Sequence, residues 1–145
     1  CFTPPLQVML ALRQAINEFD SAGGQPARYA RYETLASRLL QGMERIRFAP
    51  VIESIHRAPI ITTFAPHRGV RCPIPQLNDF LFERRLVIYP TKYWNPNSFR
   101  VGVIGELVPS DVDDLLEALS EFTTAESSSP AAGSVTRGAA LEIGK

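Results

Sequence analysis

The sequence predicts an α+β domain in which two helices precede a small sheet that helices cover on one face. Three observations predict this class. The chain has the length of one domain, 145 residues, and 45% hydrophobic with 21% charged residues is an ordinary composition for a single core. Apolar residues follow helical spacing in several segments, and β-branched or alternating segments lie between the helices. We expect the domain to span residues 1–123 and residues 124–145 to form a disordered tail.

Two helices are predicted at the N-terminal end. The first has one apolar stripe, formed by Val8, Met9, Leu12, Ile16 and Phe19. Gly23 and Gly24 end this helix. A second, longer helix runs to Arg47, and its apolar face is formed by Tyr29, Tyr32, Leu35, Leu39, Met43 and Ile46. Because the turn between them is short, we expect an antiparallel helical hairpin.

The central part of the chain predicts a sheet. Prolines interrupt helical patterns after Phe48, and a β-branched run predicts a strand over residues 59–65. Helical spacing returns from Ile74 to Leu81. A short buried strand is predicted over residues 86–89, and a second strand follows in which Phe99, Val101 and Val103 alternate with Ser98, Arg100 and Gly102. We expect these two strands to pair as a hairpin with a wide loop.

The clearest helix lies near the C-terminal end. Ser110 is placed to cap it, and the aspartates that follow suit the positive end of its dipole. Its apolar stripe is formed by Val112, Leu115, Leu116, Leu119 and Phe122. Beyond Thr123 the residues are small and polar, with too little apolar surface to offset the entropy of ordering, which predicts the tail.

Composition argues against several kinds of partner. With 15 basic and 15 acidic residues the formal net charge is zero, so nucleic acid and anionic membranes are not expected partners. No apolar run approaches the roughly 20 residues that span a bilayer, and we expect a cytoplasmic protein. Cys1 and Cys72 lack zinc-site or disulfide-framework spacing, no metal site is expected, and His56 and His67 are interpreted as surface residues. The start at Cys1 is typical of a fragment of a longer chain.

Arg100 is the main candidate binding residue. Its neighbours in residues 98–105 are apolar or small, and Gly102 shares its face of the strand. A guanidinium in such surroundings needs a partner, and its planar fork matches a carboxylate with two parallel hydrogen bonds. The pattern alone leaves two interpretations open, an internal ion pair with Glu106 or an aspartate, and a bound anion.

Two weaker candidates are Lys92 and Thr3. Lys92 lies in an aromatic loop between two strands and is one of only two lysines, with Lys145, that an aldehyde cofactor could use. Exposure to solvent is the favoured interpretation for Lys92. Thr3 precedes the first helix, a place suited to a phosphate, although an N-terminal cap is favoured by the pattern alone.

Several segments taken together resemble one family. Phe2-Thr3-Pro4-Pro5 before an amphipathic helix, then Gly23-Gly24 and residues 27–32, resemble the start of the small domain of class V pyridoxal-phosphate aminotransferases. Residues 59–64, 86–92 and 98–106 resemble, in the same order and at similar spacing, segments of 2-aminoethylphosphonate:pyruvate transaminases. The resemblance covers about residues 2–122.

The resemblance implies the C-terminal small domain of a fold-type I enzyme, in which pyridoxal 5'-phosphate bridges a large domain and this one in a homodimer. It implies that Arg100 grips the substrate carboxylate, which favours the bound-anion interpretation. It also implies that Thr3 reaches the cofactor phosphate of the neighbouring subunit. Lys92 matches a lysine that is not the Schiff-base residue, so no catalytic residue is expected in this chain, and the chain alone should be inactive.

The reaction implied for the intact enzyme is amino transfer from 2-aminoethylphosphonate to pyruvate, which gives phosphonoacetaldehyde and alanine. Two alternatives stay open. An alanine:glyoxylate or serine:pyruvate aminotransferase would use Arg100 equally well. A ferredoxin-like module that binds a small effector without catalysis shares the order strand, helix, strand, strand, helix, although the first two helices have no place in that plan.

Overall fold

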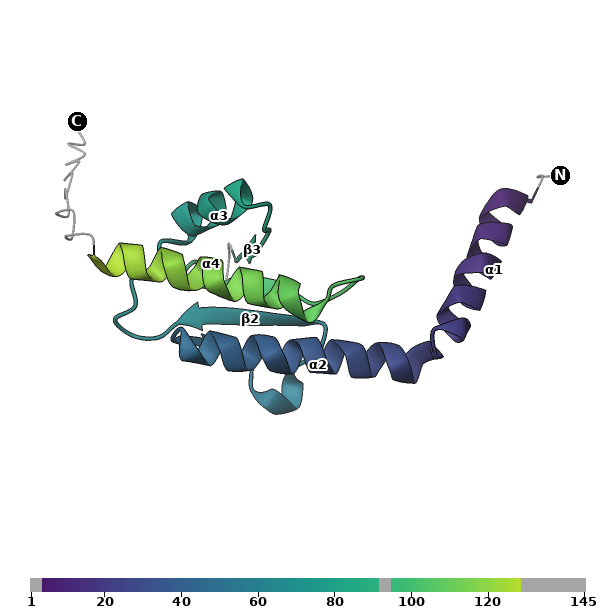
Figure 1. Cartoon of the computed structure of the whole chain (residues 1–145), viewed down its shortest axis with the longest axis horizontal. Coiled ribbons are helices and arrows are strands. Elements are labelled where there is room, and N and C mark those ends of the chain that lie inside the picture. The colour runs from purple at the N-terminus through teal and green to yellow at the C-terminus, as the bar shows by residue number, and fades with distance from the viewer. Residues whose placement is uncertain (1–3, 92–94, 129–145) are drawn as a thin grey trace, which may run out of the picture.

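A computed structural model describes residues 4–91 and 95–128 of the chain (Figure 1). The elements follow in the order α1 (Leu6–Ser21), α2 (Gly24–Arg45), β1 (Phe48–Pro50), a 3-10 turn (Ser54–His56), β2 (Ile61–Pro66), α3 (Ile74–Glu83), β3 (Tyr89–Pro90), β4 (Phe99–Gly102) and α4 (Pro109–Ser128). The α+β class predicted from the sequence is therefore confirmed. None of the described helices is long and apolar enough to cross a membrane.

The strands form one antiparallel sheet in the order β1-β2-β4-β3. Strand β4 lies inside the sheet, between β2 and β3. Strand β3, which precedes β4 in the sequence, lies at the edge of the sheet. Tyr89 of β3 lies opposite Arg100 of β4, so these strands form the predicted hairpin. The ladder between them ends there, and the expected strand over residues 86–89 is reduced to Tyr89–Pro90.

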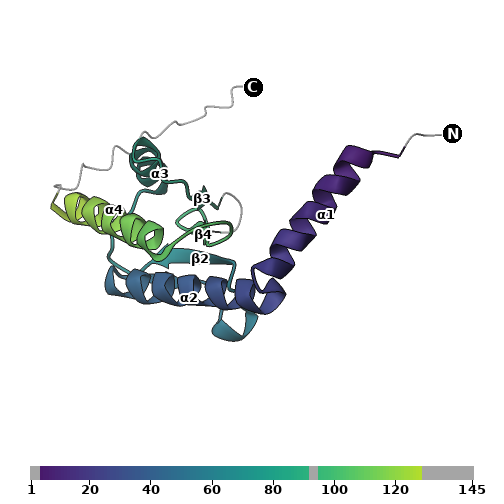
Figure 2. The ribbon, with the colours of Figure 1, turned by 45° about the vertical axis from the view of Figure 1, so that its right-hand side comes forward.

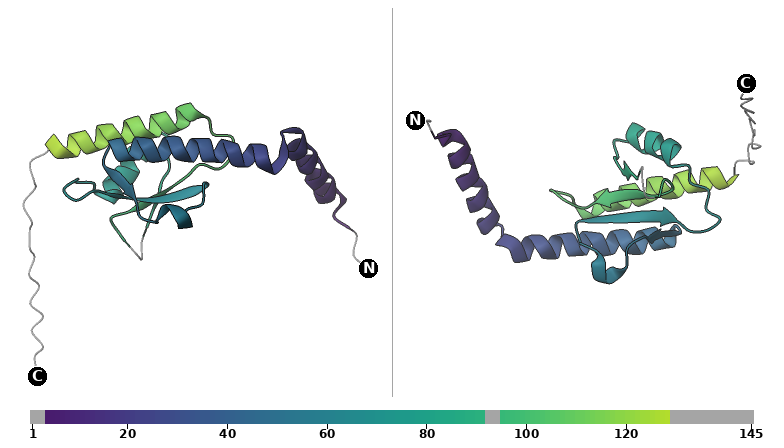
Figure 3. Two further views of the ribbon diagram at one scale, coloured as in Figure 1. Left: turned by 90° about the horizontal axis from the view of Figure 1, so that it is seen from below. Right: turned by 180° about the vertical axis from the view of Figure 1, so that it is seen from behind.

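Helices α2 and α4 lie side by side on one face of the sheet (Figure 3, left). The core between them and the strands contains the fully buried side chains of Leu35, Leu39, Met43, Phe48, Phe64, Phe99 and Leu119. The Phe99 ring is central to this layer, with its centroid 5.5 Å from that of Phe48 and 6.4 Å from that of Phe64. Helix α3 packs against α4 and extends the core with Ile74, Leu77 and Leu81.

Helix α1 departs from the predicted antiparallel hairpin. It leaves the start of α2 at an angle and points away from the sheet (Figures 1 and 2). Contact between the two helices lies near the turn, where the Arg28 guanidinium stands 4.9 Å from the centre of the Phe19 ring. No residue of α1 is buried. The spacing of apolar residues predicts the helix correctly, but it says nothing about which surface its stripe packs against.

The two ends of α4 also differ from the prediction. The helix begins at Pro109, so the predicted cap at Ser110 is wrong. The Asp111 carboxylate instead accepts a 2.7 Å hydrogen bond from the backbone amide of Val108, just before the helix. At the other end α4 continues to Ser128, past the predicted domain end at residue 123. Hydroxyls in this last part, those of Thr124, Ser127 and Ser128, donate hydrogen bonds to carbonyls one turn earlier.

Candidate carboxylate-binding groove

Arg100 projects from the face of the sheet opposite to α2 and α4. The adjacent side chains of Phe99 and Val101 are 0% and 6% exposed in the core, whereas Arg100 itself is exposed. This alternation follows from the pleat of the strand and confirms the predicted period. Thr63 of β2 and Tyr89 of β3 lie opposite Arg100 in register. The sheet therefore presents the guanidinium to the outside from a central strand, which holds its backbone firmly on both sides.

The internal ion pair considered for Arg100 is not formed among the residues that the structure describes. The apolar neighbours in the sequence suggest burial, but these neighbours point to the other face. Within residues 4–91 and 95–128, Arg100 forms no ion pair. Glu106, the partner considered from the sequence, instead lies 3.3 Å from Arg31. The guanidinium is therefore available to an anion from outside the described chain.

A groove of about 740 Å³ opens beside Arg100. It exists because β3 pairs with β4 only as far as Tyr89 opposite Arg100. Continued register would place Val87 opposite Gly102, but that pair is not formed, and the two segments separate. Apolar side chains from both segments and from helices α2 and α4 form the walls, among them Leu39, Leu86, Val87, Ile104, Leu107 and Leu115.

The charged residues of this groove are two arginines and one aspartate. Arg85 lines it together with Arg100, and Arg85 forms no ion pair with a described residue. The carboxylate is that of Asp111, which already accepts the hydrogen bond from the Val108 amide. Apolar walls with an excess of guanidinium groups are the surroundings that bind a small carboxylate.

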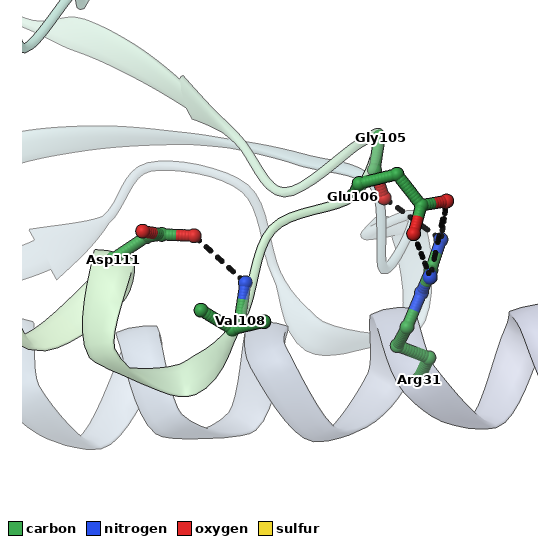
Figure 4. A network of polar contacts seen from close by, with 5 residues as sticks. All are labelled: Arg31, Gly105, Glu106, Val108 and Asp111. Atoms are coloured by element: carbon green, nitrogen blue, oxygen red, sulfur yellow. Dashed lines mark hydrogen bonds and ion pairs between the residues drawn. The ribbon is translucent and has the colours of Figure 1, made fainter.

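The loop after β4 is tied to α2 by Arg31 (Figure 4). Arg31 donates a 2.7 Å hydrogen bond from Nη2 to the carbonyl oxygen of Gly105, and Nη1 lies 3.3 and 3.4 Å from the two carboxylate oxygens of Glu106. Gly105 has a φ of 101°, a conformation that favours glycine. Sequence reasoning missed this contact, because Arg31 and Glu106 are 75 residues apart and each looks like an ordinary surface charge.

Buried hydroxyl groups close the base of the loop between β3 and β4. Thr91 and Ser98, 8% and 0% exposed, hydrogen-bond each other through their hydroxyl groups. The Ser98 hydroxyl also donates to the carbonyl oxygen of Asn95 at 2.7 Å. These contacts fix both ends of the loop that contains Lys92. Lys92 itself lies outside the described residues, and so does Thr3.

None of the other candidates among the described residues lines the groove, and Cys1 lies outside the described residues. His56 and His67 are exposed, as expected. Cys72 is 4% exposed, and burial, helped by the charge of Glu126, raises the pKa of its thiol to about 11. Such a thiol stays protonated near neutral pH and is a poor nucleophile. In the described part of the chain, no group of three or more His, Cys, Asp or Glu side chains could hold a metal ion.

Transaminases of one kind match most of the chain. The 2-aminoethylphosphonate–pyruvate transaminase 2 of Polaromonas sp. is 40% identical over 118 residues, which is 81% of this chain and 32% of the transaminase. The 2-aminoethylphosphonate–pyruvate transaminase of Vibrio cholerae is 37% identical, with the same coverage. This chain is related to one region of the 2-aminoethylphosphonate–pyruvate transaminases. It spans about a third of the length of these relatives. The chain matches no protein-family model.

Solved aminotransferases share the fold of this transaminase-related chain. An alanine–glyoxylate aminotransferase from Nostoc sp. superposes with a TM-score of 0.69 at 23% identity, over 83% of this chain and 32% of the other. A ureidoglycine–glyoxylate aminotransferase from Bacillus subtilis gives 0.70 at 17% identity, over 85% and 32%. At these identities the likeness shows the fold. It is consistent with a small C-terminal domain, and the predicted resemblance to class V aminotransferases is confirmed.

Proposed function

We propose that this chain is the carboxylate-binding part of a pyridoxal-phosphate-dependent aminotransferase that transfers the amino group of 2-aminoethylphosphonate to pyruvate. The products are phosphonoacetaldehyde and alanine. The observation that carries the proposal is Arg100, which borders an open groove and has no ion-pair partner among the described residues. The relatives named for these two substrates support the choice of reaction.

Arg100 would bind and orient the acid in this reaction. Its planar guanidinium can donate two parallel hydrogen bonds to a carboxylate, which fixes both the position and the plane of that group. Pyruvate and alanine both carry a carboxylate, so one clamp serves the acceptor and its product. The apolar walls formed by Leu86 and Ile104 reduce competition from water and strengthen the charged contact. The contribution of this chain is therefore orientation, the part of catalysis that comes from holding reactants in place.

Pyridoxal 5'-phosphate supplies the electron sink for amino transfer when it is bound. The described residues cannot hold it covalently, because residues 4–91 and 95–128 contain no lysine. Lys92 and Lys145 lie outside the described residues, and the family resemblance implies that Lys92 is not the Schiff-base residue. We therefore propose that the cofactor is attached in the part of the relatives' length that this chain does not span. Thr3 is proposed to contact the cofactor phosphate of a neighbouring subunit, as the family resemblance implies.

The exposed stripe of α1 supports the proposal that a large domain accompanies this one. Six apolar side chains of α1 are between 49% and 66% exposed, namely Leu6, Val8, Met9, Leu10, Leu12 and Ile16. A helix gains most of its stability by packing such a stripe against another surface. We propose a homodimer of the longer protein in the cytoplasm. Its partners are small amino and oxo acids, in line with the zero formal net charge, and not nucleic acids or membranes.

The clamp is tested in the longer transaminase that contains this chain. Arg100→Ala is expected to raise KM for pyruvate by roughly 10- to 150-fold, the equivalent of about 1.5–3 kcal/mol for hydrogen bonds to a charged group. Arg100→Lys keeps the charge but loses the fork, so its KM should lie between those of Arg100→Ala and the unmodified enzyme. Arg68→Ala is the control, since Arg68 is exposed and does not line the groove. Unchanged KM in Arg100→Ala would contradict the clamp.

The division of labour is tested with the 145-residue chain itself. Supplied with pyridoxal phosphate, 2-aminoethylphosphonate and pyruvate, the chain is expected to form no alanine, whereas the longer protein forms it. Chromatography of the products measures both. Alanine formed by the chain alone would contradict the assignment of the catalytic lysine to another part of the protein.

A further inference from the structure

Gly102 differs from the other described glycines in having no structural reason to be glycine. Four of them have φ between 64° and 101°, where other residues are strained: Gly23, Gly24, Gly69 and Gly105. At Gly42 an added Cβ would lie 2.1 Å from Cδ1 of Leu116. At Gly102 the φ is not positive, and the nearest atom to an added Cβ is the Ile60 carbonyl oxygen at 3.6 Å, an ordinary contact.

A glycine inside a strand weakens that strand, so its presence in β4 calls for another reason. The fold leaves room for a side chain at this position, and the empty space lies in the groove. Gly102 is two residues from Arg100 on the same face of the sheet, about 7 Å along the strand. Arg100 and Gly102 line the same groove, so a carboxylate held by Arg100 lies in the groove that also contains the space over Gly102.

The hollow over Gly102 has apolar borders. Ile61 of β2 lies opposite Gly102 in register and is 39% exposed. Val87, on the side where the β3 ladder is missing, is 63% exposed, and Ile104, in the loop after β4, is 57% exposed. These partly exposed side chains suit a small alkyl group and offer nothing to a second charge.

We propose that the hollow over Gly102 receives the alkyl group of the acid whose carboxylate Arg100 binds, and that Gly102 thereby limits the size of that acid. This inference rests on the proposed function and deepens it. The substrate class is a short aliphatic 2-oxo acid and its 2-amino product, with a side chain about the size of a methyl group. A residue larger than glycine fills the hollow, and its side chain clashes first with the methyl group of the bound acid.

The test compares pyruvate with glyoxylate, which lacks the methyl group, as acceptors for the longer transaminase. Gly102→Val is expected to raise KM for pyruvate by roughly 10-fold or more, since one carbon too many in a fitted pocket changes specificity by roughly 10- to 200-fold. The KM for glyoxylate should change much less. Gly102→Ala should raise the ratio of the KM for pyruvate to the KM for glyoxylate in the same direction, but by a smaller factor. Ala65→Val adds bulk to the same face of the sheet outside the groove and should leave both constants unchanged.

Stability and a second variant separate the possible failures. The denaturation midpoint of the 145-residue chain should not fall in Gly102→Ala, because the added Cβ meets only an ordinary contact. A fall would show that the fold needs this glycine and would overturn the inference. If the ratio of the KM values for pyruvate and glyoxylate is unchanged in Gly102→Val, including by an equal rise of both, the inference is overturned as well. If Arg100→Ala still raises both KM values, the clamp stands and only the role of Gly102 fails; if it does not, the proposed function fails.

Discussion

Arg31 on α2 donates a 2.7 Å hydrogen bond to the carbonyl oxygen of Gly105, in the loop that joins the strand of Arg100 to α4. The same guanidinium lies 3.3 Å from the Glu106 carboxylate. Ile104 and Leu107, on either side of this contact, form part of the groove wall. A helix on one face of the sheet thus fixes a wall of the groove beside Arg100.

Replacement of Arg31 should loosen this loop more than replacement of Glu106. When the ion pair is lost, the Glu106 carboxylate is hydrated, because its side chain is already 88% exposed. When Arg31 is lost, the Gly105 carbonyl also loses the hydrogen-bond donor that holds the turn. We expect Arg31→Ala to lower the urea midpoint of the chain, and Glu106→Gln to change it little. Hydrogen exchange at residues 103–108 should rise in Arg31→Ala alone. Equal effects of the two variants would mean that the ion pair, and not the carbonyl contact, holds the loop.

Phe99 anchors the strand that presents Arg100. Its ring is fully buried between those of Phe48 and Phe64. Phe99→Ala removes this packing and should lower the free energy of unfolding by about 3–5 kcal/mol, as for other buried aromatic residues. Phe82→Ala is the matched control, because Phe82 is 70% exposed and its loss should change stability by about 0.5 kcal/mol or less. Urea unfolding of both variants measures the difference, and a loss in Phe99→Ala as small as that in Phe82→Ala would contradict the anchoring role of Phe99.

The sequence predicts elements whose signal is local. Phe99, Val101 and Val103 alternate with polar or small residues, and all three are buried, because a strand packed on one face shows its period directly. The stripe of α4 is recovered in the same way, since Val112, Leu115 and Leu119 face the core at helical spacing. The side of the sheet that bears Arg100 follows from this alternation.

Features that depend on contacts between residues far apart in the chain could not be predicted from the sequence. The first turns of α2 carry Tyr29, which is 47% exposed, because the helix extends beyond the sheet at that end. The three residues of β1 form a strand only through pairing with β2, and their own pattern is too short to show it. The partner of Glu106 is a further case, since nothing near Arg31 in the sequence indicates the loop it meets.

The ion pair between Arg38 and Asp113 joins the two helices that cover the sheet. Arg38 donates from Nε to Oδ1 at 2.7 Å and from Nη2 to Oδ2 at 2.6 Å, and both side chains are about half exposed. The hydrogen bonds from Arg38 lower the pKa of the Asp113 carboxyl below its ordinary value. A carboxyl with a lowered pKa in the folded chain stabilises the fold when ionised. That stabilisation is complete above the ordinary pKa of about 3.9 and is lost as the pH falls through the lower value of the folded chain.

Asp113→Asn should therefore be less stable than the unmodified chain at neutral pH, by an amount that shrinks below about pH 4 as Asp113 takes up a proton. The gap should also narrow in 1 M NaCl, because salt screens a half-exposed pair. Urea unfolding between pH 3 and 7 measures it. Asp114→Asn is the control, since the neighbouring Asp114 forms no ion pair with a described residue and its replacement should change stability at neutral pH little. A gap that stayed the same from pH 7 down to pH 3 would show that the difference between the two chains does not come from the ionised Asp113 carboxylate.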